Sequence, residues 1–333
     1  MENNKIDLSE NTIDERNLKK IGWIYFAVLL SLTVFRIFVY TFLSETSDNV
    51  LDMVFTSVTQ ILLMGILPFF AYTAFVSKGN AAQRLQTTAN DFGYKTKLSP
   101  IVYISAIIIG LLLFFANYGA AYVSTIFLKI FGYNFSAVTP TMIPNVGYLF
   151  MWIFFTAVLP ACFEEMSHRG LLLGTMRHVN EKQAIIISAL MFALMHQNIV
   201  QTFYAFIAGI ILGKIACYTK SIFPAMIIHF LNNALGVVLD YSEQHGGKIY
   251  EVFTSVFSDL SLSKLAILVF AWTIAYYAIF RLLDKVKLFC AEGSEQPKMP
   301  VASLKIKYNN GLIFAIVLGI ITTIITFVWG LLR

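Results

Sequence analysis

The residues best suited to chemistry lie in three apolar stretches between positions 147 and 240. Glu164 and Glu165 stand side by side in the first stretch, His196 ends the second, and His229 lies in the third. An ionisable side chain costs about 2.5–3.5 kcal/mol at the centre of a bilayer, so such residues tend to pair and to carry function. Carboxylates and imidazoles are also common general acids and bases. The pattern therefore predicts an acid–base site built from three membrane helices.

Helical spacing indicates how the first stretch is organised. Glu165 and Arg169 are four residues apart with the acid first, which is the favourable order for an ion pair. We expect this buried pair to fix the helix and to orient Glu164. Glu164 and His168 have the same spacing, and neighbouring residues point about 100° apart, so the two carboxylates face different partners. Pro160 removes a backbone hydrogen bond one turn earlier and is expected to distort the helix.

The second and third stretches add groups at a similar depth. His229 and Asn233 are four residues apart and share a helix face. Counted from the basic residues at one membrane interface, Glu164 and His196 lie roughly 20 Å deep and His229 roughly 13 Å deep, at 1.5 Å per residue. One site is thus predicted. The alternative is that the carboxylates clamp helices together and that the histidines and Asn233 serve as interhelical hydrogen-bonding groups.

Composition defines the elements that must position these residues. Of the 333 residues, 58% are hydrophobic and 13% are charged, whereas soluble domains carry about 25% charged residues. A helix needs about 20 apolar residues to cross a bilayer. The chain has nine such stretches, at about 21–43, 51–76, 101–128, 147–168, 183–199, 200–218, 222–240, 264–283 and 311–332. We expect an all-α polytopic transmembrane helix bundle with about eight or nine spans.

The charges indicate topology and not a nucleic-acid partner. The net charge of +5 lies between apolar runs, in alternate loops, whereas a nucleic-acid protein would gather it on one face. Basic loops stay in the cytoplasm, which predicts a cytoplasmic segment at residues 1–20 and an extracytoplasmic C-terminus. The remainder, 21–333, is expected to form one transmembrane domain in a plasma membrane, with a composition typical of bacteria. Arg36 lies inside the first span, where snorkelling to the outer headgroups would explain it.

Three motifs occur in order: Glu164-Glu165-xxx-Arg169, Phe192-xxx-His196 and His229-xxx-Asn233. Together they resemble the CPBP family of intramembrane proteases, the CAAX proteases and bacteriocin-processing proteins, also called Abi. Type II CAAX prenyl proteases belong to it. The resemblance covers about 147–240, which would be the catalytic core. It implies hydrolysis of a peptide bond in a membrane-associated protein or peptide that is prenylated or bears a leader.

The resemblance and the residue types together predict roles. Peptide hydrolysis needs an activated water, an oxyanion stabiliser and a proton donor for the leaving amine. Glu164 would be the general base, assisted by His196, while His229 and Asn233 would stabilise the oxyanion. The family usually has an aromatic residue before Arg169. Here that position is His168, which would either tune Glu164 or be inert.

The sequence leaves alternatives open for both the cofactor and the function. Glu164, His196 and His229 form a set that can hold zinc with one open position for water, so the cofactor is either none or zinc. We favour the metal-free glutamate mechanism. A non-catalytic scaffold or bacteriocin-immunity protein on the same fold is the second function considered, and a proton-coupled transporter is the third. The sequence shows neither the inverted repeat nor the pair of broken helices typical of transporters.

Overall fold

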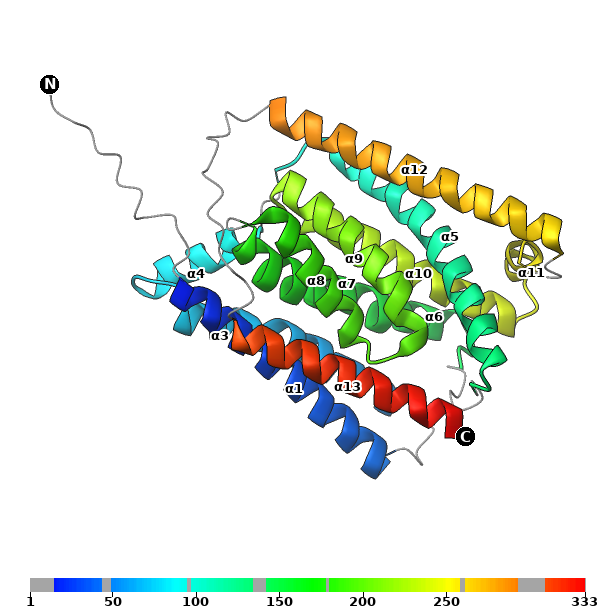
Figure 1. Ribbon diagram of the computed structural model, residues 1–333, viewed down its shortest axis with the longest axis horizontal. Helices are drawn as coiled ribbons and strands as arrows, with labels where there is room; N and C mark the ends of the chain where they lie inside the picture. The colour runs from blue at the N-terminus through cyan, green and yellow to red at the C-terminus, as the bar shows by residue number, and fades with distance from the viewer. Residues whose placement is uncertain are drawn as a thin grey trace, which may run out of the picture.

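The predicted all-α architecture is confirmed by the computed structural model (Figure 1). The structure describes residues 15–43, 49–94, 97–133, 142–177, 180–257, 261–292 and 309–332, and among these every regular element is a helix. In this part of the chain, eight helices are long and apolar enough to cross a membrane. A cytoplasmic N-terminal segment is expected at residues 1–20. Positions 1–14 of it lie outside the described residues, and the remaining positions belong to α1, which begins at Glu15.

Each pass through the bundle is a single helix or a chain of helical segments that follow one another directly. The single helices are α1 (Glu15–Leu43), α5 (Pro100–Ile130), α8 (Glu181–Met195), α9 (Ile199–Thr219), α10 (Phe223–Gln244), α12 (Leu262–Glu292) and α13 (Asn310–Leu332). The composite passes are α2–η1–α3 (Asn49–Ser57, Val58–Ile66, Leu67–Phe75) and α6–η2–α7–η3 (Val146–Ile153, Phe154–Val158, Leu159–Glu165, Met166–Gly174). The segments labelled η are π-helical. Two short helices, α4 (Ala81–Asp91) and α11 (Lys248–Ser255), lie between passes.

Helix α8 returns the chain through the bundle although it is too short to span a bilayer alone. It has 15 residues, which corresponds to about 22 Å. It runs antiparallel to α9, because Ile185 packs against Gly213 and Ala189 packs against Gly209. The absence of a side chain at Gly209 lets the two backbones approach closely. In the described residues, eight helices could cross a membrane, within the predicted eight or nine spans, and α8 adds a ninth, shorter pass through the bundle.

The helix ends at one side of the bundle, here called the basic end, gather most of the positive charge. Lys20 near the start of α1 donates to Phe75 O at the end of α3 (2.7 Å), and Asn309 before α13 donates to Leu18 O (2.6 Å). The basic end carries Arg16, Lys19, Lys20, Lys78, Arg84, Lys97, Arg177, Lys182, Lys220, Lys285 and Lys287. The opposite end of the described chain carries Lys129, Lys248 and Lys264.

The start of α1 and the end of α13 lie at opposite ends of the bundle. The two helices run parallel, since Gly22 of α1 packs against Gly311 of α13 at the basic end. Towards the other end, both helices contact Gln197, through Arg36 of α1 (3.4 Å) and through Thr326 of α13 (2.7 Å). An odd number of passes likewise puts the first and the last helix ends on opposite sides of the bundle.

The segment before α5 covers the basic end with a capped helix. Helix α4 has eleven residues and begins after Asn80. Asn80 and Gln83 form a reciprocal capping box, which satisfies backbone donors at the helix start. At the other end of α4, Asp91 accepts a hydrogen bond from Tyr72 of α3 (2.8 Å).

Pro160 distorts its pass as predicted, and the distortion is used for packing. A π-helical segment, η2, ends two residues before this proline. Because proline has no N–H, the carbonyl of Thr156 four residues earlier loses its α-helical partner. Asn233 of α10 donates its amide to this carbonyl (3.1 Å). The bond ties α10 to the pass that carries Glu164.

Pro68 likewise leaves a backbone carbonyl without its helical donor in the second pass. It follows the π-helical η1 and leaves the carbonyl of Met64 without its α-helical donor. Ser167 of η3, which is fully buried, donates to this carbonyl (2.6 Å). A carbonyl without a partner is costly in hydrocarbon, so each such bond stabilises the contact between passes.

The topology predicts that the two ends of the bundle face opposite sides of the membrane. Single cysteines at Lys78 and at Lys248, in a chain with its three native cysteines replaced by alanine, should react with a membrane-impermeant maleimide from opposite sides of sealed vesicles. Both positions are exposed. Labelling of both from the same side would contradict the nine-pass arrangement.

Candidate active site

The two adjacent carboxylates of α7 are buried and face different partners. Glu164 is 7% exposed and Glu165 is fully buried. Glu164 Oε1 accepts a hydrogen bond from Gln60 Nε2 (2.8 Å), and its Oε2 lies 4.0 Å from His229 Nε2. That second oxygen has no hydrogen-bond partner among the described residues. Glu164 therefore has one oxygen held in place and one available.

The predicted ion pair is present, and it also contacts His229. Arg169 donates to Glu165 Oε1 (2.8 Å), and its other terminal nitrogen donates to Gly209 O on α9 (3.2 Å). The same Glu165 oxygen lies 2.9 Å from His229 Nδ1. The two neighbouring carboxylates diverge on the helix, and Glu165 holds His229. That the pair also orients Glu164 stays a prediction.

The hydrogen bonds of the two candidate catalytic histidines define which ring nitrogen is available. His196 Nδ1 lies 2.8 Å from the carbonyl of Phe192, which can only accept, so this nitrogen donates. His229 Nδ1 donates to Glu165, since that oxygen is already an acceptor for Arg169. In the neutral rings, both Nε2 atoms are therefore proton acceptors.

The ring of Phe192 packs against three histidine rings. Its centroid lies 5.2, 5.0 and 5.5 Å from those of His168, His196 and His229, each edge-to-face. The guanidinium of Arg169 lies over the same ring at 4.5 Å, a cation–π geometry. Phe192 thus brings three passes to a common point, which spacing along the chain does not show.

The turn that carries His196 is held by α1 and α13. Gln197 adopts a left-handed backbone conformation, with φ of 51°. Its side chain donates to Thr33 (2.6 Å), and its carbonyl accepts from Thr326 (2.7 Å). Arg36 donates to the carbonyls of Met195 and His196 (3.1 and 3.2 Å).

The contact made by Arg36 adds a role that the snorkelling explanation does not include. The guanidinium caps the C-terminus of α8, where carbonyls are unpaired and the helix dipole is negative. Sequence reasoning missed this role because the acceptors are backbone atoms 159 and 160 residues away along the chain.

Asn233, one of the predicted site residues, is part of a chain of hydrogen-bonded asparagine side chains. Asn117 of α5 donates to Asn232 (2.9 Å), Asn232 donates to Asn233 (3.2 Å), and Asn233 donates to Thr156 O. One of its two N–H groups is thus used for packing. The second N–H has no bond assigned to it and is the one an oxyanion would use.

His168 does not touch the Glu164 side chain. Its Nδ1 donates to the backbone carbonyl of Glu164 (2.7 Å), which leaves Nε2 to accept from Tyr25 OH of α1 (2.8 Å). The ring is fully buried. Of the two roles left open for His168, the geometry favours a packing role between α1 and η3.

The side chains as placed do not fit a three-ligand zinc site. Among the described residues, no group of three His, Cys, Asp or Glu side chains is arranged to hold a metal ion. Glu164 Oε2 and His229 Nε2 approach to 4.0 Å, but no third His, Cys, Asp or Glu side chain among the described residues joins them in a group that could hold a metal ion. We therefore derive no catalytic step through a metal.

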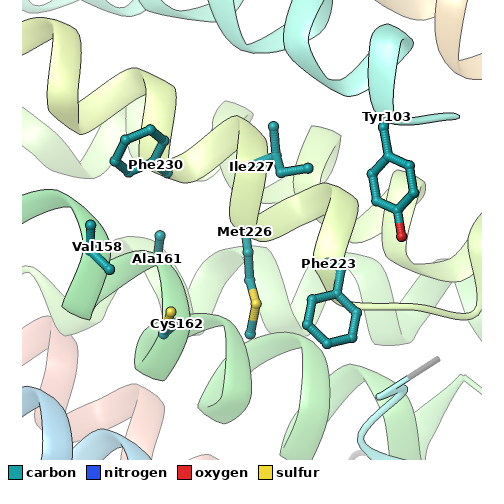
Figure 2. Close-up of a pocket in the computed structure, with 8 residues that line it drawn as sticks. All are labelled: Tyr103, Val158, Ala161, Cys162, Phe223, Met226, Ile227 and Phe230. Carbon is teal, nitrogen blue, oxygen red and sulfur yellow. The ribbon is translucent and has the colours of Figure 1, made fainter. Parts of the chain in front are cut away.

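An apolar groove of about 290 Å³ lies between α5, the η2–α7 segment and α10 (Figure 2). Tyr103 and Phe223 lie at one end of it, and Val158 and Phe230 lie at the other. Its full lining is Tyr103, Val158, Ala161, Cys162, Phe223, Met226, Ile227 and Phe230. Two of its walls are thus the helices that carry Glu164 and His229.

The fold and the cluster define a class: a polytopic membrane protein with a buried carboxylate–histidine site suited to acid–base chemistry. Within it, residues 146–235 match the family model of type II CAAX prenyl endopeptidases, Rce1-like. This match confirms the resemblance expected from the three motifs, over almost the same part of the chain. It supports a CAAX-type intramembrane protease as the general function. Comparisons with curated proteins and with solved structures gave no match.

If His168 serves packing, replacing it should affect stability and not catalysis. His168→Phe leaves the buried Tyr25 hydroxyl without its main acceptor, so the free energy of unfolding should fall by about 1–3 kcal/mol. Peptidase activity should stay near that of the wild type. Tyr25→Phe is the matched control, since it removes the same bond from the other side. A large loss of activity in His168→Phe alone would show that His168 acts on the site.

Proposed function

We propose that this protein is an intramembrane endopeptidase in which Glu164 activates a water molecule. The observation that carries the proposal is the free Glu164 Oε2, buried in the bundle and 4.0 Å from His229 Nε2. It lies in the segment that matches the CAAX prenyl endopeptidase family. A carboxylate oxygen with no other partner can take a proton from water, and low-dielectric surroundings strengthen such interactions.

In the first step, water attacks the peptide carbonyl carbon while Glu164 Oε2 takes its proton. We propose that His196 assists: its Nδ1 donates to Phe192 O, which leaves Nε2 as the nitrogen that would accept a second hydrogen bond from the water. The carbonyl oxygen becomes an oxyanion as the carbon turns tetrahedral. In the second step, the C–N bond breaks, protonated Glu164 gives the proton to the leaving amine, and the carboxylate is restored.

His229 and Asn233 are proposed to stabilise the oxyanion. Glu165 holds the Nδ1 side of His229, so the ring donates to an oxyanion when Nε2 also carries a proton. Asn233 contributes the N–H that is not bonded to Thr156. Preorganised donors of this kind are typically worth about 10²–10³-fold in rate.

The isosteric Glu164→Gln substitution should abolish cleavage and preserve the fold. The new side-chain amide can still accept from Gln60 through its oxygen but cannot take a proton, so the rate should fall by about 10²–10⁴-fold. Cleavage of a quenched prenylated CAAX peptide by the purified protein measures this. Glu251→Gln, at an exposed position of α11, is the matched control and should cleave like the wild type. Equal rates for Glu164→Gln and the wild type would refute the assignment, and a chelator added in parallel would reveal a metal.

We place the basic end in the cytoplasm. Eleven described Lys and Arg residues gather there, against three at the opposite end, and positive loops stay on the cytoplasmic side. This puts the start of α1 inside and the end of α13 outside. In the labelling experiment above, the cysteine at Lys78 should therefore react from the cytoplasmic side, and reaction from the outer side would invert the assignment.

We also propose that the apolar groove accepts the hydrocarbon chain of a lipid-modified substrate. The groove shares α7 and α10 with the candidate catalytic residues, and Cys162 and Phe230 in its wall lie within two residues of Glu164 and His229. Its lining is apolar apart from Tyr103 and Cys162, as a hydrocarbon requires.

Filling the groove should weaken recognition of a prenylated peptide. Val158→Phe adds a ring at one end of the groove, so KM for the prenylated peptide should rise while kcat changes little. Val123→Phe, on the exposed face of α5, is the control and should leave both constants unchanged. An unchanged KM in Val158→Phe would remove the groove from substrate binding.

A further inference from the structure

Gln60 touches the proposed general base from a helix outside the family match. It lies in η1 of the second pass, whereas the matched segment is 146–235. Its side chain is buried, with 8% of the residue's surface exposed. Its Nε2 donates to Glu164 Oε1 at 2.8 Å. None of the three sequence motifs includes this residue.

The contact selects between two chemically equivalent oxygens. The terminal torsion of a glutamate is broad, so a free carboxylate would present either oxygen to the water. A hydrogen bond to an ionised acceptor is about twice as strong as a neutral one. With Oε1 held by Gln60, Oε2 is the oxygen that faces His229 Nε2.

We propose that Gln60 is a positioning residue that fixes the Glu164 carboxylate with Oε2 as the proton acceptor. The inference rests on the proposed function, because it assigns how that general base is oriented. A neutral amide suits the task, since it adds a donor without a second cation next to the Glu165–Arg169 pair. Its own Oε1 is buried and has no partner among the described residues, which leaves an acceptor beside the carboxylate for a donor from water or substrate.

The simpler alternative is that Gln60 only docks the second pass onto the fourth. The structure offers a matched control for it. Ser167 of η3 donates to Met64 O of η1, so it joins the same two passes, one helical turn along η1 from Gln60. It does so without touching the Glu164 carboxylate. Docking would predict equal effects from losing either bond, and positioning would not.

The first arm of the test compares Gln60→Leu with Ser167→Ala. Gln60→Leu keeps a similar volume but removes the donor, so kcat should fall by about 10- to 100-fold with little change in KM, as expected for a misplaced catalytic group. Ser167→Ala should lower the melting temperature and leave kcat near that of the wild type. Wild-type kcat in Gln60→Leu, or the same loss of kcat in both variants, would overturn the proposal.

The second arm of the test asks whether a different hydrogen-bond donor at position 60 restores kcat. In Gln60→Glu, a protonated carboxyl group can donate the same hydrogen bond to Glu164, and an ionised one cannot. The ratio of its kcat to that of the wild type should therefore rise as the pH is lowered. The other titratable or charged groups around the site are the same in both proteins: Glu165, Arg169, His196, His229 and Arg36. Glu164 is not constant in the comparison, because two carboxyl groups in contact share one proton. A ratio that stays flat with pH would also overturn the proposal.

The two arms keep the inference separate from the proposed function. Glu164→Gln, run alongside, tests the general base itself. If Glu164→Gln is inactive while Gln60→Leu and Gln60→Glu behave like the wild type, the proposed function stands and the role of Gln60 is refuted. If Glu164→Gln remains active, both ideas fail together.

Discussion

The structure depends on one constraint: a polar group inside the bilayer has to find its partner within the protein. Glu165 and Arg169 are almost completely buried, and each ionised group would be costly there alone. They are tolerated because they pair with each other and because Arg169 also bonds Gly209 O and lies over Phe192. Glu165 also accepts a hydrogen bond from His229. A pair that stabilises the bundle thus also orients a proposed catalytic ring.

The same constraint explains why the prolines and the polar side chains occur together. Pro160 and Pro68 each deprive a carbonyl of its helical donor, and Asn233 and Ser167 restore one from another pass. The freed backbone atoms become specific acceptors at fixed positions along each helix. Since a mismatched register would leave both groups unpaired in hydrocarbon, these bonds favour one arrangement of the passes.

The candidate site is therefore assembled from elements that are far apart in the chain. Glu164 is held from the second pass, His196 from α1 and α13, and His229 from Glu165 on α7. The passes outside the family match thus supply contacts that set the geometry within it. The matched segment alone therefore does not contain all the contacts that position these side chains.

The sequence alone determined the helical membrane class, because a chain that is 13% charged cannot cover a soluble surface. It also determined the nine apolar stretches, the Glu165–Arg169 pair and the family resemblance, since these follow from local spacing. Tertiary structure alone decided that Glu165 orients His229, that His168 contacts Tyr25, that Arg36 caps α8 and that Gln60 holds Glu164. Each of these contacts joins different passes and residues at least 64 positions apart in the chain. Periodicity gives the face on which a side chain lies, but only packing selects the partner that it meets.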